Sequence, residues 1–536
     1  MKHGIRILAL LLLLCLLPVG LLACGGDDDE TTTRRPIEGV EVDPKWDNVD
    51  LSDVHLYIGY NEVVAQTVLD TGAGNSAIYL IGPDEDGDHS RGDYKAAYER
   101  HALVCSVLGL SQGKNGNLTY TETGWGGTDE TLKIIQDYNA ADMDNTPNII
   151  IHQNYGMVRG GILGEFYNAY ESEYTNYFDL THEGWYLDMM EENSLDPKNQ
   201  IYMLMGDYFI DQFRFAYGVL VNTSMIDQIL RFEDGMEGLY EIVRSGDWTY
   251  DEFKRIASLG YTPASTGESL VMGAIGESAW VSRTFFASSG LDIFQKDTNG
   301  IPTYVSDPTV ISAWLDQMLS MQRESWFEHG WDLNRQLNTN RETAAKTFIN
   351  DGAVFAMNQM ILSFEGSNIL NMDSPASIVP TPKYVPVGQE NDHSTSYKAL
   401  TSDHAGSGGI LISSDPTQFT AATAFLQLMT EQSGEFFTQY YENGLKHRDN
   451  EAGIGHIDML DFIHDGVCSP MSFLYDNYCA KSLGGDVKVY SHIMQEILKN
   501  GSNTFSSSWS TRYNATSNRW NSIRQNFGSS AAGVVQ

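Results

Sequence analysis

Cysteine is scarce in this sequence, with 5 residues among 536. Three thiols, those of Cys105, Cys468 and Cys479, lie beyond the N-terminal segment, and this number cannot form a disulfide framework. A pairing of Cys468 with Cys479 outside the cell stays open at this point. No Cys-x-x-Cys motif and no histidine-rich pair indicates zinc, so the sequence predicts neither a metal site nor a cofactor.

Positive charge is also scarce, because 33 lysine and arginine residues stand against 71 aspartate and glutamate residues, for a formal net charge of −38. This excess of negative charge argues against nucleic acid and anionic lipid headgroups as partners, since both would repel the protein. The chain is also longer than the roughly 250–300 residues that a single hydrophobic core supports. The sequence therefore predicts at least two lobes.

Long hydrophobic runs are confined to the N-terminus, where Ile7–Leu22 is almost uninterrupted. A basic start, an apolar core and small residues, in this order, predict a secretory signal peptide at residues 1–23. The cysteine directly after Ala23 resembles the lipobox of bacterial lipoproteins, in which the thiol of Cys24 is acylated. The alternative is a plain secretion signal with an incidental cysteine.

Residues 24–49 are polar and lack apolar periodicity. Such a stretch predicts a flexible tether that begins at the lipidated Cys24. Lipidation would hold the protein at the cell membrane, facing away from the cytoplasm, without spanning the bilayer.

Short apolar runs alternate with helical patterns in the rest of the chain. The runs DVHLYIGY, LTYTE and NIII predict strands, and residues 92–110 and 129–141 predict helices. This alternation is typical of α/β architecture. Two further helix starts carry capping residues: Thr249 with Glu252, and Ser414 or Asp415 before Pro416.

The triplet Asp70-Thr71-Gly72 follows two apolar residues, as the catalytic aspartate of an aspartic protease does. That chemistry needs two carboxylates that share one proton, and the chain has no second apolar-apolar-Asp-Thr/Ser-Gly. The triplets around Asp297 and Asp351 are turns. We therefore interpret Asp70 as part of a structural turn.

Two patterns imitate metal sites. Asp84, Asp86 and Asp88 have the spacing of a calcium loop, but its sixth and twelfth positions hold His89 and Lys95 instead of glycine and glutamate. His456 and His464 lie eight residues apart among aspartates in a predicted helix. A solvated acidic loop and a polar helix face explain these patterns better than metal binding does.

Several longer segments together resemble one family. They are YEIVRSGDWTYDEFKRIA (240–257), IYMLMGDYFIDQFRFAYGVLVNTSMID (201–227), TFINDGAVFAMNQM (347–360), IVPTPKY (378–384), GILISS (409–414) and QYYENGLKHRDNEAGIGHIDMLDFI (439–463). In this order they resemble the extracellular solute-binding proteins, family 1, which serve ABC importers of sugars and oligosaccharides. The resemblance runs from about Leu51 to Trp520 and departs in an extended C-terminus.

The resemblance implies a two-lobed, periplasmic-binding-protein-like α/β fold of type II, with lobes that are discontinuous in sequence and joined by a hinge. Lobe one would comprise residues 50–209 and 353–414, and lobe two residues 210–352 and 415–536. The ligand would lie between the lobes. Their closure would present a surface to the membrane subunits of the permease.

The function implied is that of a monomeric, non-enzymatic receptor that captures a sugar or oligosaccharide and delivers it to an ABC permease. One alternative is a binding protein of the same fold for peptides or polyamines, because an acidic cleft favours cations. A surface glycan hydrolase is a second alternative, since such an enzyme needs two acidic residues that flank a bond and the chain has 71 aspartate and glutamate residues.

Sugars present apolar C–H faces and a rim of hydroxyl groups, which match aromatic rings and planar polar side chains. Ligands of α/β sheets bind at the carboxyl ends of strands. These criteria, with the resemblance, select Trp125, Asn154, Tyr155, Asp207, Tyr208, Trp280, Asn358 and Gln359 as ligand-binding candidates, and Trp509 as a late platform in lobe two.

Overall fold

The computed structural model describes residues 42–61, 68–70, 73–83, 87–113, 115–124, 128–141, 146–195, 200–265, 269–298, 300–305, 307–329, 340–447, 456–470, 472–476 and 490–525. All of them belong to one compact unit, Gly39–Gln536. The predicted signal peptide and Cys24 lie outside the described residues, as does Cys479, so its pairing with Cys468 is not tested. Within the described part, no helix has the length and apolar character that a membrane crossing requires.

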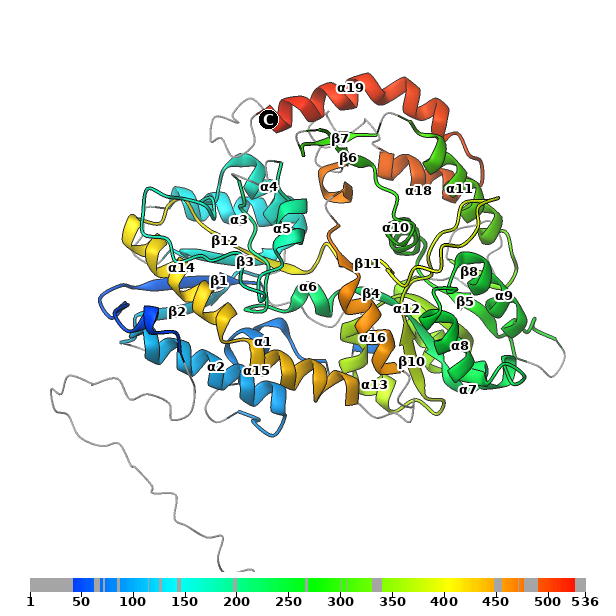
Figure 1. The fold of residues 1–536 in the computed structure, drawn as a ribbon, viewed down its shortest axis with the longest axis horizontal. Helices are drawn as coiled ribbons and strands as arrows, with labels where there is room; N and C mark the ends of the chain where they lie inside the picture. The colour runs from blue at the N-terminus through cyan, green and yellow to red at the C-terminus, as the bar shows by residue number, and fades with distance from the viewer. Residues whose placement is uncertain are drawn as a thin grey trace, which may run out of the picture. The chain divides into compact units, whose positions relative to one another are not determined.

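The first sheet has the strand order β12-β3-β1-β2 (Figure 1). Its strands are β1 (Leu56–Tyr60), β2 (Leu118–Glu122), β3 (Ile149–Gln153) and β12 (Gly406–Ile410). β1 runs parallel to β2 and β3, whereas β12 is antiparallel to β3. All five residues of β3 are buried, as the apolar run in its sequence predicts for a parallel strand covered on both faces.

Four helices pack on this sheet or on one another beside it, and together with the sheet we call them the first half. They are α2 (Gly92–Leu108), α3 (Thr128–Ala140), α4 (Asn154–Leu163) and α14 (Pro416–Glu431). α14 begins at a capping box in which the Asp415 side chain accepts from the main-chain N–H of Gln418, and Pro416 occupies the first turn. The predicted start of this helix is confirmed.

The second sheet has the order β10-β4-β9-β5-β8. Its strands are β4 (Tyr217–Asn222), β5 (Met272–Ile275), β8 (Phe327–Glu328), β9 (Ala353–Met360) and β10 (Ala376–Val379). β4 is antiparallel to β9 and β10, and β5 is parallel to β8 and β9.

The second half comprises this sheet and the helices that pack around it. They are α7 (Thr223–Ile229), α8 (Gly235–Arg244), α9 (Tyr250–Gly260), α10 (Ser278–Ser288), α11 (Thr309–Gln322) and α12 (Arg341–Ile349). At the start of α9 the Thr249 side chain accepts from the N–H of Glu252, so this predicted cap is confirmed as well. The α/β class predicted from the sequence is confirmed in both halves.

The strand pairing differs from the division into lobes that the resemblance implies. Residues 353–414 were expected in lobe one, but β9 pairs with β4 and β5, and β10 pairs with β4, so both lie in the second sheet. Residues 415–536 were expected in lobe two, but α14 packs on α2 and β1 of the first half. The sequence could not assign these strands, because every residue of β4 and β9 is buried and a buried strand can satisfy its main-chain groups in either sheet.

The remaining elements lie outside the two sheets and the helices named with them. They are η1 (Pro44–Trp46), η2 (Val68–Asp70), α1 (Ser76–Ile81), α5 (Leu187–Glu192), α6 (Asp211–Arg214), β6 (Phe294–Lys296), β7 (Pro302–Tyr304), η3 (Ile361–Glu365), α13 (Ser367–Leu370), β11 (Ala399–Leu400), α15 (Gly434–Phe437), η4 (Thr438–Glu442), η5 (Leu445–His447), α16 (His456–Asp465), β13 (Val467–Cys468), α18 (Tyr490–Asn500) and α19 (Phe505–Gln525). β11 pairs in parallel with β13, and β6 pairs with β7. α18 and α19 pack against α11.

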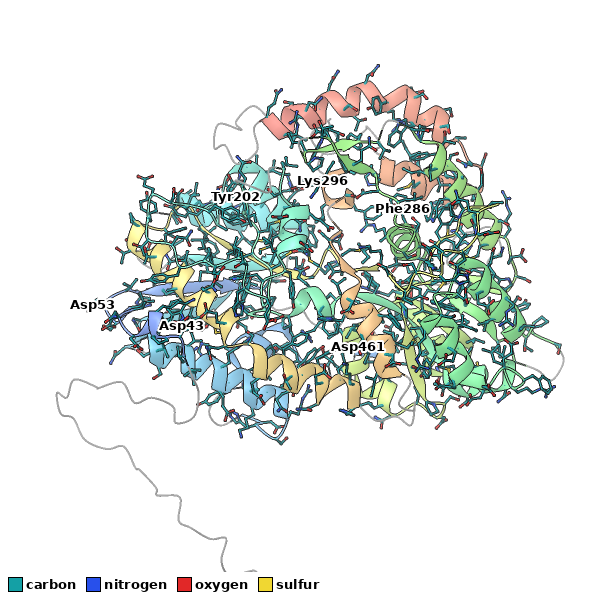
Figure 2. The ribbon with its side chains drawn as sticks, viewed as in Figure 1. Asp43, Asp53, Tyr202, Phe286, Lys296 and Asp461 are labelled. Carbon is teal, nitrogen blue, oxygen red and sulfur yellow. The ribbon has the colours of Figure 1, made fainter. Side chains whose placement is uncertain are left out.

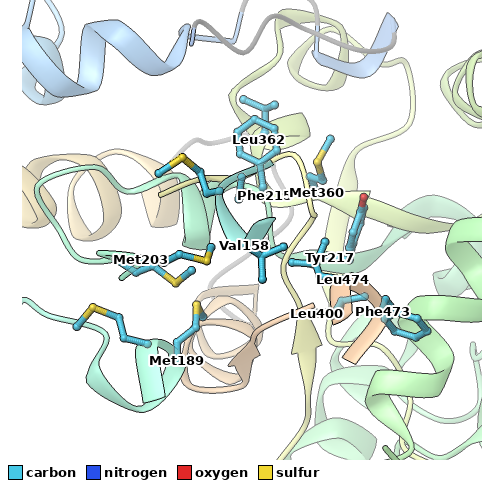
Figure 3. Close-up of a cluster of buried hydrophobic side chains, with 14 of the residues drawn as sticks. Val158, Met189, Met203, Phe215, Tyr217, Met360, Leu362, Leu400, Phe473 and Leu474 are labelled. Carbon is cyan, nitrogen blue, oxygen red and sulfur yellow. The ribbon is translucent and has the colours of Figure 1, made fainter. Parts of the chain in front are cut away.

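A continuous apolar core joins the two halves. Figure 3 shows part of it, with side chains from α4, α5, β4, β9, β11 and the segment after β13. Among them Val158 belongs to the first half, Met360 to the second sheet and Phe473 to the late segment, and each is 5% exposed or less. The hydrophobic effect therefore holds both halves against the segments that run between them.

Asp70 lies in η2, which packs against α12, α13 and η3 of the second half although β1, just before it, belongs to the first sheet. Its carboxylate accepts a hydrogen bond of 2.8 Å from the hydroxyl of Ser363, and the residue is 1% exposed. The structure thus gives Asp70 a tertiary contact between distant segments, which agrees with the structural interpretation.

Candidate ligand-binding site

The carboxyl end of β3 brings polar groups to the edge of the first sheet. Gln153 is extended and ends the strand, and α4 begins directly after it. The Tyr155 hydroxyl donates to the side-chain oxygen of Gln153, and the Tyr155 N–H donates to the carbonyl of Asp403 at 3.3 Å. The Tyr155 ring meets the His404 ring edge-on, with 5.3 Å between centroids. A strand end, a helix start and the segment before β12 therefore converge here.

The second half contributes cations to the same place. Arg283 of α10 donates from Nη1 to the Asp403 carboxylate at 3.1 Å, and these side chains are 17% and 15% exposed. Tyr217, the first residue of β4, donates to the hydroxyl of Ser402 at 3.2 Å, and Arg341 of α12 reaches the Tyr217 hydroxyl at 3.5 Å. We call this cluster the strand-end site; its members are Tyr155, Tyr217, Arg283, Arg341, Asp403 and His404.

Burial and charge determine the protonation of this site. Burial lowers the pKa of His404, the two arginines act in the same direction, and Asp403 opposes them. The imidazole is therefore neutral at neutral pH. Burial raises the pKa of Tyr155 and of Tyr217, so both hydroxyls stay protonated and can donate or accept hydrogen bonds. The site offers neutral rings beside one guanidinium–carboxylate pair.

Asn358 has an unusual environment near the end of β9. Its φ is +52°, a left-handed conformation that costs a non-glycine residue about 1–2 kcal/mol. The side chain is 2% exposed, and neither atom of its amide has a hydrogen-bond partner among the described residues. A Cβ added to Gly276, at the end of β5, would lie 2.7 Å from the Asn358 side-chain oxygen. A buried, strained and unpaired amide at a strand end is typical of a functional position.

Asp207 lines a cavity of about 680 Å³ that we call the aromatic cavity. Its lining residues are Glu183, Trp185, Tyr186, Leu187, Asp188, Met189, Asp207, Phe213, Gly434, Phe437, His464 and Val467. The Tyr186 hydroxyl donates to one carboxylate oxygen of Asp207 at 2.6 Å. Burial raises the pKa of Asp207 to about 6.

A smaller cavity of about 320 Å³ lies beside the end of α10 and the β6–β7 hairpin. Phe286 and Lys296, both labelled in Figure 2, contribute to its lining. Lys398 lines it too, together with the carboxylates of Glu192 and Asp292. Two cations face two anions, so the charged lining does not select a ligand by the sign of its charge.

Three predicted residues lie in packed surroundings. Asn154 is 0% exposed and exchanges amide hydrogen bonds with Gln212 at 3.1 and 3.2 Å. Tyr208 is 1% exposed and donates to the Leu204 carbonyl at 2.7 Å. Trp509 is 2% exposed, and its ring lies 5.4 Å from that of Phe505. These contacts give each residue a structural role, and ligand contact by any of them stays a prediction.

The other candidates are placed differently. Gln359 is 3% exposed and donates to the carbonyl of Met357 at 2.9 Å. Trp125 lies outside the described residues. Trp280 lies in α10, and its side chain is outside the described part. The structure thus brings Tyr155 into the strand-end site and Asp207 into the aromatic cavity, and it leaves the two tryptophans untested.

Sequence reasoning missed most of the strand-end site. Arg283, Arg341, Asp403 and His404 carry no local motif, and Arg283 meets Asp403 across 120 residues of sequence. The one usable signal was the position of Asp403 and His404 just before the glycine-rich strand β12. Among the described residues, no three metal-ligating side chains are grouped as a metal site would require.

No family model matches the sequence, and no curated protein matches it. Several solved structures are similar to this chain. The MalE maltose/maltodextrin-binding domain of Bdellovibrio bacteriovorus, bound to maltotriose, is 13% identical, with 88% of this chain and 99% of that chain covered and a TM-score of 0.47. The GacH receptor of Streptomyces glaucescens, solved unliganded and with acarbose, is 9% identical over 89% and 99% of the two chains, with a TM-score of 0.47.

A family 1 extracellular solute-binding protein from Bifidobacterium longum subsp. infantis is also similar. It is 9% identical, with 88% of this chain and 100% of that chain covered and a TM-score of 0.48. At such low identity and TM-score, the description of the fold rests on the strand order and pairing given above.

Proposed function

We propose that this protein is the substrate-binding component of an ABC importer and that it captures a sugar or oligosaccharide at the strand-end site, without altering it. The observation that carries this proposal is the convergence of Tyr155 from α4 of the first half, and of Asp403 from the segment before β12, with Arg283 and Arg341 from the second half. The segments quoted above, which resemble the family of sugar receptors, support the same conclusion.

The chemistry of the site suits a carbohydrate. The rings of Tyr155 and His404 offer apolar faces for C–H groups, and guanidinium and carboxylate groups make paired hydrogen bonds with neighbouring hydroxyls. The amide of Asn358, which has no partner among the described residues, adds one donor group and one acceptor. Tyr155 and Asn358 are the predicted residues that we retain as ligand contacts here.

Because the site draws on both halves, a bound ligand favours the arrangement in which the halves are close together. In this proposal the halves act as lobes, and segments that pass between them, including α6 and β11, act as the hinge. Closure then creates the surface that the permease subunits recognise.

The N-terminal pattern completes the proposal. Acylation at Cys24 would anchor a monomeric receptor outside the cytoplasm, and the polar stretch after it would let the receptor reach the permease. The formal charge of −38 would keep the protein away from an anionic membrane surface.

The test is a titration of the full chain with neutral mono- and oligosaccharides, followed by tryptophan fluorescence and calorimetry. We expect at least one glycan to bind with micromolar affinity or better, about −8 kcal/mol, and to raise the melting temperature. If no glycan shifts emission or melting temperature, the sugar assignment is wrong. If the glycan is recovered shortened, with new reducing ends, the protein is a hydrolase and not a receptor.

A further inference from the structure

The aromatic cavity has a one-sided charge. Three carboxylates, those of Glu183, Asp188 and Asp207, belong to its lining. No lysine or arginine belongs to the described lining. Nothing in the proposed binding of a neutral sugar at the strand-end site uses these groups, so the cavity calls for a separate explanation.

Aromatic rings, with a few aliphatic side chains, form the rest of its walls. The Phe213, Phe437 and His464 rings pack against one another, with centroid distances of 6.1 Å between the phenylalanines and of 5.2 and 5.6 Å from them to the histidine. Trp185 contributes another ring, and its indole N–H donates to the Gln427 side chain at 2.9 Å. These contacts hold the rings in place.

Asp207 is fixed in position but only half satisfied. Its N–H donates to the Gly184 carbonyl at 2.8 Å, and its carbonyl accepts from Arg100 and Ser433, each at 3.0 Å. One carboxylate oxygen accepts from Tyr186, and the other makes no hydrogen bond with any described residue. The described chain also places no cationic side chain within ion-pair distance of this carboxylate. Arg100, whose guanidinium donates to the Asp207 carbonyl, acts on the carboxylate from beyond that distance, as His464 and His182 do. At neutral pH the cavity therefore contains a half-buried negative charge that forms no ion pair.

We propose that the aromatic cavity binds a small organic ammonium ion, which pairs with the carboxylate of Asp207 and lies against the aromatic rings. A positive charge is attracted both to the carboxylate and to the faces of aromatic rings. The volume of about 680 Å³ lies in the range of small-molecule pockets.

This site is distinct from the strand-end site. On α6 the side chain of Gln212 bonds to Asn154 and to the Gly406 carbonyl at the end of the first sheet, whereas the next residue, Phe213, lines the cavity. The inference therefore goes beyond the proposed capture of a sugar, and either can fail without the other.

The test compares choline with 3,3-dimethylbutan-1-ol, which has the same shape and no charge, by calorimetry on the full chain at pH 7.5. We expect choline to bind at least tenfold more tightly than the alcohol. Because the charge of choline does not titrate, its affinity should fall as the pH drops below 6 and Asp207 becomes protonated. Equal affinity for the two compounds, or no detectable binding of choline, would overturn the inference.

Variants test whether choline binds in the aromatic cavity. Asp207→Asn should lower choline affinity at least tenfold, while Asp137→Asn, which removes the same charge from the exposed face of α3, should leave it unchanged. Phe437→Leu should lower the affinity for choline severalfold and the affinity for the alcohol less. This variant tests the contribution of the aromatic ring to choline binding if Asp207→Asn does not fold. Asp207→Asn binding choline like the wild type would refute the assignment. The glycan titration of the same samples reports separately on the proposed function.

Discussion

Two regions place charged side chains in buried or half-buried surroundings, and they are built differently. Around Arg214, the guanidinium makes paired hydrogen bonds with Glu365 at 2.8 and 3.0 Å and a third bond with Asp211 at 3.2 Å. The hydroxyls of Tyr79 and Tyr440 donate to the same glutamate. At the aromatic cavity, the Asp207 carboxylate accepts from one hydroxyl and forms no ion pair, although Arg100 donates to the Asp207 carbonyl nearby. The first region is satisfied by the protein itself, and the second is not.

The difference indicates separate roles. The Arg214 network joins α1, α6, η3 and η4, which are far apart in sequence, and Arg214, Asp211 and Glu365 are each 3% exposed or less. Burial alone would lower the pKa of Arg214, but the carboxylates raise it well above its usual value. A satisfied network stabilises the fold, whereas an incompletely satisfied charge beside a cavity can bind a ligand.

Breaking the satisfied network should have the largest effect. Arg214→Met leaves the carboxylates of Glu365 and Asp211 buried without a cation, which should lower the free energy of unfolding by about 3–5 kcal/mol. Urea denaturation measures this loss in the free energy of unfolding. Arg255→Met is the control, because Arg255 forms exposed ion pairs with Glu233 and Glu252, each worth at most about 1 kcal/mol. Equal losses in the two variants would show that the Arg214 network is not special.

The unsatisfied carboxylate should behave in the opposite way. In the folded protein burial raises the pKa of Asp207 from its usual value near 3.8 to about 6, so ionisation destabilises the fold above pH 6. This penalty disappears as the pH falls from 6 towards 4. Asp207→Asn should therefore be more stable than the wild type at pH 7 by about 2–3 kcal/mol at most, and equally stable at pH 4. A difference that does not change with pH would contradict this account.

The contrast also explains what the sequence could predict. The helix starts at Thr249 and Asp415 were predicted because a cap is a local interaction between residues three apart. Tyr155 was predicted because it comes a few residues after the apolar run NIII, at the carboxyl end of a predicted strand, where ligands of α/β sheets bind. Each of these signals lies within a few residues of the feature that it predicts.

Other features depend on contacts that no short segment contains. The pair Arg283–Asp403 and the network of Arg214 with Glu365 join residues more than a hundred positions apart. The prediction that placed β9 in lobe one was wrong for the same reason. The sequence of a buried apolar strand does not show which sheet the strand joins. The unpaired state of Asp207 likewise depends on what surrounds it in space.

At the strand-end site, removal of one partner should affect the ligand more than the fold. Arg283→Gln keeps a donor but removes the charge beside Asp403, so sugar affinity should fall about ten- to thirtyfold, or 1.4–2 kcal/mol. Arg159→Gln is the control, because Arg159 pairs with Asp129 within the first half. Calorimetry with the glycan found in the panel measures both variants. An unchanged affinity in Arg283→Gln would remove this residue from the site.

The smallest change in stability is expected at Asn358, and it offers a matched comparison. Asn358 and Asp351 both adopt positive φ, at +52° and +55°, but Asp351 accepts a hydrogen bond of 2.8 Å from Asn222, whereas the Asn358 amide has no partner among the described residues. Glycine relieves the backbone strain at either position. Asp351→Gly, however, also loses a bond worth about 1 kcal/mol.

Asn358→Gly should therefore stay within about 1 kcal/mol of wild-type stability and be no less stable than Asp351→Gly in the same denaturation experiment. Its sugar affinity should nevertheless fall severalfold, because an unpaired amide contributes to the ligand and not to the fold. Asp351→Gly should leave the affinity unchanged. If Asn358→Gly lost stability and kept its sugar affinity, the amide would contribute to the fold, as the groups around Arg214 do. The distinction between polar groups that the protein satisfies and polar groups that bind a ligand would then not hold at Asn358.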